Sequence, residues 1–255
     1  MDGTVVDETT VLSAGAHVYC YRDLPDEVEV PFDLPILYRD DDIVVVDKPH
    51  FLATMPRGGH VVQTALVRLR RDLGLPELSP AHRLDRLTAG VLLFTARREV
   101  RGRYQTMFAR GEMDKTYLAV AEGNPAVELP TVVRNRIVKR RGVLQAGIEP
   151  GEPNAETLIE ALGAGHYRLT PRTGRTHQLR LHMASLGLPI AGDTLYPEVI
   201  RVAREDFSSP LQLLAHSLGF DDPMTGRRRR FVSHRTVGPG SSGTAPVLGT
   251  DDDHP

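Results

Sequence analysis

Cysteine is almost absent from this chain: Cys20 is the single one among 255 residues. One thiol excludes an internal disulfide and a cysteine-rich metal site. Long apolar runs are absent as well, and no segment approaches the roughly 20 apolar residues of a membrane span. The N-terminus carries Asp2, Asp7 and Glu8 and lacks the basic-then-apolar pattern of a secretory signal. These absences favour a cytoplasmic protein that does not bind membranes.

Charge is distributed unevenly along the chain. The net formal charge is −2. However, residues 1–50 hold 12 acidic and 3 basic side chains, whereas residues 51–250 hold 28 Lys and Arg against 18 Asp and Glu. The basic side chains cluster at 68–71, 97–103, 134–141 and 227–230. Such clusters are often solvated faces, but several of them in one domain of excess positive charge indicate a surface for a phosphate backbone.

Hydrophobic periodicity predicts a strand-rich α+β chain. Apolar runs predict strands at 36–38, 43–47, 91–95, 116–121, 213–220 and 230–233, with several short strands between 130 and 171. Apolar residues at helical spacing, followed by Gly or Pro, predict helices at 61–73, 99–110 and 176–186. We find no internal repeat. Gly, Ser, Pro and Asp dominate residues 238–255, which predicts a disordered tail.

The most informative segment is His-Arg-Leu-Asp-Arg-Leu-Thr-Ala-Gly at residues 82–90. Asp85 lies between Arg83 and Arg86 and precedes a Thr-Ala-Gly turn that leads into an apolar strand. Neighbouring positive charge favours the ionised carboxylate, and the arginines supply what a polyanionic substrate needs. The residues alone leave two interpretations open, namely an active site or an ordinary ion pair at a strand edge.

Four further segments accompany it in a fixed order. They are Tyr38–Pro49, which ends in Lys-Pro; Lys115–Gly123, which begins Lys-Thr-Tyr-Leu; Pro171–Asp193, which contains Arg-Thr-Gly-Arg-Thr-His-Gln-Leu-Arg and Pro-Ile-Ala-Gly-Asp; and Leu214–Gly226, which begins Leu-Ala-His-Ser-Leu-Gly-Phe. Together with 82–90, they resemble the RluA-type pseudouridine synthases over about residues 36–233. The resemblance implies a curved, mixed, mostly antiparallel sheet with flanking helices and a central cleft.

The same resemblance implies roles for single residues in an enzyme that isomerises uridine to pseudouridine in RNA. Asp85 is expected to be the nucleophile, Arg180 to pair with it through its guanidinium fork, and Tyr117 to stack on the base and serve as a candidate general base. Arg83 is expected to fill the gap that the target base leaves in its stack. Contacts to the RNA are expected from His82, Arg86, Thr88, Arg175 and His177.

The implied chemistry requires no cofactor, because it involves no redox change and no energy input. A carboxylate near C1′ or the base is what glycosyl transfer generally uses. His177 and His182 do not indicate a metal site, because five residues on a helix set them about 140° apart. An ordinary structural role stays open for Tyr117 as a core tyrosine, for Arg180 as an ion-pair residue, and for His82 as a hydrogen-bonded structural histidine.

Three departures from the family pattern affect the prediction. Ala89 replaces the usual Ser, one small residue for another. Lys48-Pro-His-Phe51 lacks the glycine of the usual Lys-Pro-x-Gly, so this loop is expected to be shaped differently. Residues 1–35 are predicted to be a remnant of an S4-type RNA-binding module plus a linker, because residues 2–21 resemble only its last hairpin. The catalytic domain is predicted to span 36–237.

Two other functions stay open at this stage. One is an RNA-binding or ribosome-assembly factor that has this fold but no catalytic activity. The other is a nucleosidase-like glycosyl hydrolase, which needs a second carboxylate; Glu112 and Asp114 are the nearest candidates. The sequence does not choose between ribosomal and transfer RNA. A monomer is expected, because the sequence shows no obvious apolar stripe for dimerisation.

Overall fold

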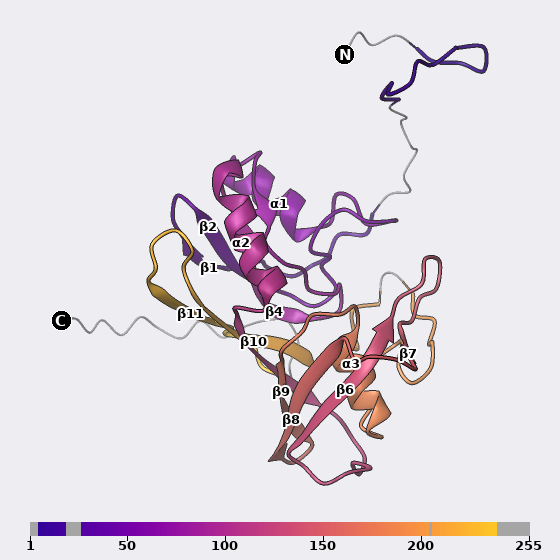
Figure 1. Ribbon diagram of the computed structural model, residues 1–255, viewed down its shortest axis with the longest axis vertical. Coiled ribbons are helices and arrows are strands. Elements are labelled where there is room, and N and C mark those ends of the chain that lie inside the picture. The colour runs from indigo at the N-terminus through magenta and orange to yellow at the C-terminus, as the bar shows by residue number, and fades with distance from the viewer. Residues whose placement is uncertain (1–4, 19–26, 204–205, 239–255) are drawn as a thin grey trace, which may run out of the picture.

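One sheet of 11 strands runs through the described part of the chain, and three helices accompany it (Figure 1). The computed structural model describes residues 5–18, 27–203 and 206–238. The strands are β1 (Ile36–Arg39), β2 (Ile43–Lys48), β3 (Ser79–Pro80), β4 (Ala89–Thr95), β5 (Asp114–Val120), β6 (Thr131–Val138), β7 (Gly147–Glu149), β8 (Ala155–Gly163), β9 (His166–Pro171), β10 (Leu213–Asp221) and β11 (Arg228–Val232). The helices are α1 (Ala65–Leu73), α2 (Arg98–Arg110) and α3 (Gln178–Ser185).

The strand order is β1-β2-β4-β10-β5-β9-β8-β6-β7, with β3 paired to β4 and β11 to β10. Among the described strands, β4 and β10 form the one parallel pair, and the other pairs are antiparallel. The expected α+β fold with a mixed, mostly antiparallel sheet is therefore confirmed.

Strands β2 and β4 are covered on both faces of the sheet, and every residue of these two strands is buried. Successive side chains of a strand point to opposite faces. Val44 and Val46 accordingly join the apolar core that includes α1, whereas Ile43 and Val45 join the core that includes α2. Burial on both faces explains why these strands are continuous β-branched and aliphatic runs rather than alternating ones.

Gly90 lies where β4 pairs with β10, directly after the Asp85 loop. Its φ of +112° is in the region that favours glycine, and a Cβ atom there would overlap the carbonyl of Ala215. The glycine that ends the 82–90 segment therefore lets two strands approach closely beside the candidate site.

Helices α1 and α3 begin later than their sequence patterns predict. The predicted helix 61–73 begins only at Ala65, because the carboxylate of Glu27 accepts hydrogen bonds from the backbone N–H groups of residues 61–63. Thr64 then caps α1 by accepting a bond from the Val67 N–H at 3.2 Å. Helix α3 begins at Gln178 rather than 176, after His177 adopts a left-handed φ of +59°.

Helix α2 matches its prediction closely. It spans Arg98–Arg110, and Gly111 ends it with a φ of +74° while its N–H bonds back to the last turn. The left-handed conformation of this glycine is the usual way for a helix to stop. The position of the stop is relevant to function, because Phe108 to Gly111 form one rim of the pocket described below.

The ends of the chain leave part of the domain prediction untested. Residues 5–18 form turns and contain no strand, while 2–4, 19–21 and 239–255 lie outside the described residues. The S4-like hairpin, the boundary at residue 36 and the disordered tail therefore stay predictions.

In the described residues Val30 is buried in the core around α1. No helix found there combines the length and the apolar character needed to cross a bilayer.

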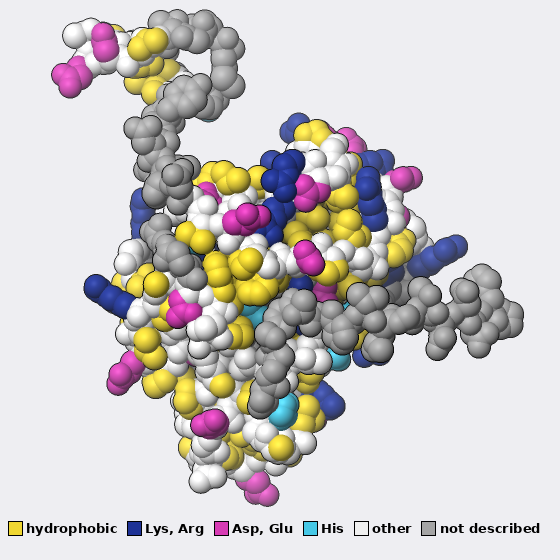
Figure 2. Space-filling view, turned by 180° about the vertical axis from the view of Figure 1, so that it is seen from behind, with side chains coloured by type: hydrophobic (Ala, Val, Ile, Leu, Met, Phe, Trp, Pro, Cys, Tyr) yellow, Lys and Arg dark blue, Asp and Glu magenta, His cyan; other side chains and the backbone are white. Residues whose placement is uncertain are grey.

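Charged side chains are dispersed on the face seen in Figure 2. Lys and Arg side chains stand singly or in small groups, mostly over the upper part of the molecule that holds α1 and α2, and acidic and hydrophobic side chains lie between them. On this face the basic clusters of the sequence do not merge into one continuous basic surface. The site described next is where basic side chains surround a cavity.

Candidate active site

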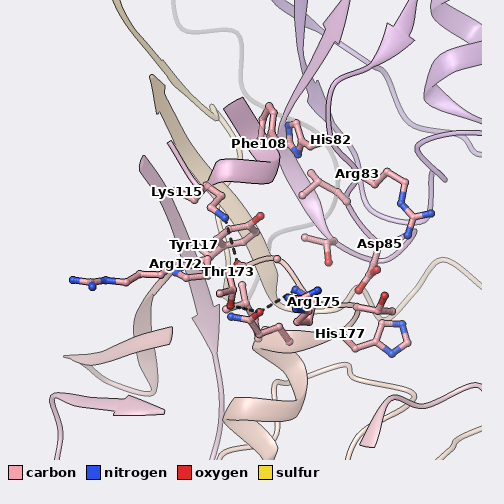
Figure 3. Close-up of a pocket in the computed structure, with 18 of the residues that line it drawn as sticks. His82, Arg83, Asp85, Phe108, Lys115, Tyr117, Arg172, Thr173, Arg175 and His177 are labelled. Carbon is pink, nitrogen blue, oxygen red and sulfur yellow. Dashed lines mark hydrogen bonds between the residues drawn. The ribbon is translucent and has the colours of Figure 1, made fainter. Parts of the chain in front are cut away.

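A pocket of about 690 Å³ lies between the 81–88 loop, the end of α2, strand β5 and the loop that joins β9 to α3 (Figure 3). Its volume is in the range of small-molecule sites. Asp85, Tyr117 and Arg180 all line it. Three residues that lie far apart in the sequence, and that were predicted to act together, are thus brought to one cavity.

Asp85 occupies a tight turn whose ends are fixed. The N–H of Thr88 donates to the carbonyl of Asp85 at 3.1 Å, and the carboxylate keeps 33% of its side chain exposed. Lys48, at the end of β2, is fully buried. Its Nζ donates to the carbonyls of Pro49, Leu52 and Arg86 at 2.9, 2.8 and 3.3 Å. The lysine at the end of β2 therefore ties the Asp85 loop to the sheet. Burial lowers the pKa of Lys48 well below its usual value, and the charge of Asp85 opposes that shift.

Arg180 is committed mainly to a different carboxylate from the expected one. Its Nε and Nη2 donate to the two oxygens of Asp193 at 2.8 and 2.5 Å, and both side chains are almost fully buried. Its Nη1 lies 3.7 Å from Asp85. The expected ion pair between Arg180 and Asp85 is present, but the expectation that the guanidinium fork binds Asp85 is wrong, because Asp193 occupies the fork.

Tyr196 holds this arginine from the other side. The Arg180 guanidinium lies 5.5 Å from the Tyr196 ring centroid. The Tyr196 hydroxyl donates to the Ala146 carbonyl at 3.1 Å and accepts from the Ala146 N–H at 2.6 Å, and His177 Nδ1 lies 3.1 Å from it. Arg180, Asp193 and Tyr196 therefore form a buried unit that fixes one charged wall of the pocket.

Tyr117 projects from β5 into the pocket. Burial, followed by the charge of Asp85, raises the pKa of Tyr117 well above its usual value of 10. Its hydroxyl is therefore neutral across the physiological pH range in the free protein. A phenolate base is disfavoured here, whereas a flat ring beside Asp85 is available to a planar ligand.

His82 is a neutral histidine with a structural partner. Its Nε2 accepts a hydrogen bond from the Leu93 N–H at 3.1 Å, and its ring stacks on Phe108 with centroids 4.4 Å apart. Burial, with a contribution from Lys115, lowers its pKa to about 3. These contacts favour the interpretation of His82 as a hydrogen-bonded residue that orients the loop.

The other residues predicted to contact RNA fall into two groups. Arg83, Thr88, Arg175 and His177 line the pocket with His82. Arg83 is exposed at the rim of the pocket (Figure 3). Thr88 is buried. Arg86 is not part of the lining, because its guanidinium lies over the Phe51 ring, 5.9 Å from the centroid. Burial lowers the pKa of His177, and the charge of Asp85 opposes that shift.

Metal ligands do not gather anywhere in the described part of the chain, where no group of three or more His, Cys, Asp or Glu side chains could hold an ion. His182 is buried and within 3.0 Å of both Thr157 Oγ1 and Asn135 Oδ1. Asn135 Oδ1 can only accept, so Nε2 of the neutral ring donates to it and Nδ1 accepts from the Thr157 hydroxyl. Both nitrogens of the ring are thus engaged within the protein.

Three residues of the site were missed by sequence reasoning. Asp193 ends a segment that was noticed, but nothing in its spacing predicts a bond to Arg180, 13 residues earlier. Tyr196 follows that segment and carried no signal. Lys115 is the first residue of the Lys-x-Tyr strand. Because i and i+2 side chains share a strand face, its place beside Tyr117 could have been inferred.

The loop after Lys48 keeps a glycine-like backbone in spite of its sequence. Phe51 stands where the family pattern has glycine, and its φ is +66°. A left-handed conformation costs a bulky residue about 1–2 kcal/mol. The ring of Phe51 is buried against Phe32 and Phe207. Phe51 therefore keeps a left-handed backbone conformation without being glycine, because aromatic packing holds the loop in place.

Comparison with known proteins identifies the family of this chain. Residues 42–185 match the family model described as RNA pseudouridylate synthase. The chain is 32% identical over 232 residues to an uncharacterized RNA pseudouridine synthase of Synechocystis, covering 86% of this chain and 79% of that one. This chain belongs to the RNA pseudouridine synthase family. The enzyme is therefore an isomerase that acts on RNA.

Two further relatives support the assignment of this synthase. It is 32% identical over 213 residues to the dual-specificity RNA pseudouridine synthase RluA of Haemophilus influenzae, covering 78% of this chain and 91% of that one. The solved structure of human RNA pseudouridylate synthase domain containing 1 superposes with a TM-score of 0.63 at 25% identity, covering 82% and 86% of the two chains. The resemblance to RluA-type enzymes is thus confirmed.

Proposed function

We propose that this synthase isomerises uridine to pseudouridine in ribosomal or transfer RNA, with Asp85 as its catalytic carboxylate. One observation carries the proposal: a partly exposed carboxylate, a tyrosine ring and a buried arginine from three distant segments line one pocket. The acid lies beside the Arg180 guanidinium, with Nη1 3.7 Å from its carboxylate. It is exposed enough to reach a substrate, as a nucleophile must be.

The isomerisation balances without any cofactor. The bond between N1 and C1′ breaks, the released uracil rotates, and a bond forms between C5 and C1′. The hydrogen on C5 is lost, and N1 gains a proton. Asp85 supplies negative charge where C1′ or the base becomes electron-poor, as carboxylates do in glycosyl transfer. Tyr117 supplies a stacking surface for the base, and its neutral hydroxyl favours this role over that of a general base.

Arg180 and Arg83 take separate roles in this scheme. Arg180 is a positioning residue, since Asp193 and Tyr196 fix its guanidinium so that only Nη1 faces Asp85. Arg83 is exposed at the rim, so that it can occupy the space a flipped uridine leaves in the RNA. Arg175 and His177 border the same opening and are proposed to contact the RNA there.

The substrate class rests on the named relatives. The Haemophilus enzyme is described as having dual specificity, and a Vibrio cholerae relative, 33% identical over 214 residues, is described as tRNA pseudouridine synthase C. For this chain we propose ribosomal or transfer RNA, action as a monomer without a cofactor, and a cytoplasmic location. The single cysteine supports the proposed location, because cytoplasmic proteins rarely depend on disulfides.

The test is release of tritium from C5 of labelled uridine in unmodified transcripts of transfer RNA and large-subunit ribosomal RNA. Release that matches the amount of pseudouridine in the digested RNA supports the proposal, and the responding transcript identifies the substrate. Tight RNA binding without release would instead indicate a non-catalytic assembly factor. Appearance of free uracil would indicate a glycosyl hydrolase.

A further inference from the structure

Lys115 lines the pocket at the opposite side of Tyr117 from Asp85 (Figure 3). Both side chains come from β5, and residues two apart on a strand point to the same face. The lysine is half-buried, and its Nζ donates to the Thr173 carbonyl at 3.3 Å. The pocket therefore has a carboxylate at one end, a flat ring in the middle and an ammonium at the other end.

This ammonium has no carboxylate partner in the part of the chain that the structure describes. An ammonium has three donors, and one long bond to Thr173 uses only one of them. Burial lowers the pKa of Lys115, which reflects the cost of holding the charge there. Burying a charge without a partner is unfavourable. The arrangement therefore has unused donor capacity that faces into the cavity.

The three lysines of the chain show how unusual this arrangement is. Lys48 is fully buried but has three carbonyl acceptors. Lys139 is exposed on the loop between β6 and β7 and bonds to local carbonyls. Of these three, Lys115 is the one that lines the pocket beside Asp85, and it does so in a chain that otherwise uses arginine. A compact ammonium suits a single oxygen acceptor, whereas a guanidinium suits a planar pair.

Uracil has the shape that this pocket requires. In the six-membered ring, C4 with its carbonyl lies opposite N1, and C2 with its carbonyl lies opposite C5. A base that stacks on Tyr117 with C1′ at Asp85 consequently points a carbonyl away from the sugar in both linkages. Uridine presents O4 at this far edge, and pseudouridine presents O2. The rotation exchanges one acceptor for the other at the same place.

We propose that Lys115 is a catalytic residue that donates a hydrogen bond to the far carbonyl of the target uracil, to O4 before rotation and to O2 after it. The assignment rests on the proposed function, since it assumes that the base stacks on Tyr117 with C1′ at Asp85. When the N1–C1′ electron pair leaves with the base, the negative charge spreads onto these oxygens. A preorganised cation at this edge stabilises that charge. Cytosine, with an amino group at C4, offers no acceptor there.

The test crosses a protein change with a substrate change. Single-turnover conversion is measured for wild type and Lys115→Met on the responding transcript, made with either uridine or 4-thiouridine and read by chromatography of digested nucleosides. Lys115→Met is expected to slow uridine conversion by about 10²-fold, the effect of losing one oxyanion donor. Sulfur accepts hydrogen bonds weakly, so wild type should convert 4-thiouridine about tenfold more slowly than uridine. This ratio of the uridine rate to the 4-thiouridine rate is the thio effect. In Lys115→Met the two rates should be equal.

Two further variants make the result decisive. Lys139→Met removes an exposed lysine and should keep the full thio effect. Lys115→Gln replaces the cation by a neutral donor, which covers the case that Lys115→Met fails to fold. An equal thio effect in wild type and both Lys115 variants overturns the assignment while the proposed function stands. A wild type that converts neither transcript contradicts the proposed function and, with it, the assignment.

Discussion

Arg180 divides its guanidinium between two carboxylates that differ in exposure. Asp193 is almost fully buried and takes two hydrogen bonds, whereas Asp85 keeps 33% of its side chain exposed and lies 3.7 Å away. Burial alone lowers the pKa of Arg180, but the bonds and charge of Asp193 outweigh it, so the net shift is upward. The buried carboxylate thus fixes the arginine, and the exposed one is left free for chemistry.

Asp193→Asn is therefore expected to lower both stability and activity. Removing one member of a buried ion pair leaves the other charge uncompensated and costs about 3–5 kcal/mol of unfolding free energy. The turnover rate should fall as well, because Arg180 is no longer held at Asp85. Urea denaturation and single-turnover kinetics measure the two effects. The matched control is Asp72→Asn, which breaks an exposed pair with Arg71 and should change stability by less than about 1 kcal/mol.

The burial of His182, on α3, makes the free energy of unfolding depend on pH. Burial lowers its folded-state pKa from 6.5 to about 4. Between these values the unfolded chain binds more protons, so the stabilisation is complete above pH 6.5 and is lost as the pH falls towards 4. The advantage of wild type over His182→Gln should therefore shrink by about 3 kcal/mol between pH 7 and pH 4. Denaturant unfolding at four pH values measures this, with the exposed His234→Gln as control. A difference that does not change with pH would contradict the buried, neutral assignment.

At the scale of elements, local patterns predicted what local forces determine. Strands β2 and β4 were predictable because they are continuous apolar runs, and α2 because Gly111 ends it. The start of α1 was not predictable, since Glu27, which binds its preceding turn, is 34 residues away from Val61. The bonds between Arg180 and Asp193 were not predictable either, because these residues lie on different segments, 13 residues apart. Contacts between distant segments leave no periodic signal in either partner.

The positive φ of Phe51 predicts how two substitutions there differ in stability. Phe51→Ala removes the buried ring but keeps the left-handed strain, so it should cost about 3–5 kcal/mol of unfolding free energy. Phe51→Gly also removes the ring but relieves about 1–2 kcal/mol of strain. The glycine variant should therefore be the more stable of the two in urea denaturation. An alanine variant as stable as the glycine variant would show that the left-handed conformation is not retained in solution.

At the scale of the whole molecule, one sheet brings the proposed catalytic groups from both of its halves to one pocket. Asp85 comes from the half that packs on α1 and α2, and Arg180 comes from the half that packs on α3. Tyr117 lies on β5, where the two halves meet. The sequence segments identified this set because each contains a recognisable motif. The geometry between them depends on the pairing of β4 with β10 and of β10 with β5.

RNA bound across this pocket should show a strong dependence on salt. Each phosphate contact contributes a slope of about −0.7 to −0.9 to log K against log salt concentration. Arg83→Gln, at the rim, should reduce the slope by about one contact. Arg71→Gln, on α1 and outside the pocket lining, should leave it unchanged. Filter binding between about 50 and 200 mM salt distinguishes the two, and equal slopes would contradict a path of the RNA over Arg83.

The most direct test of the account is the single-turnover rate of Asp85→Asn on the transcript that wild type modifies, measured together with RNA affinity. The substitution keeps the size of the side chain but removes the carboxylate. We predict a fall in conversion of about 10⁴-fold or more, with RNA affinity within about threefold and an unchanged unfolding transition. A variant that folds, binds and converts uridine at more than about a tenth of the wild-type rate would contradict the assignment of Asp85.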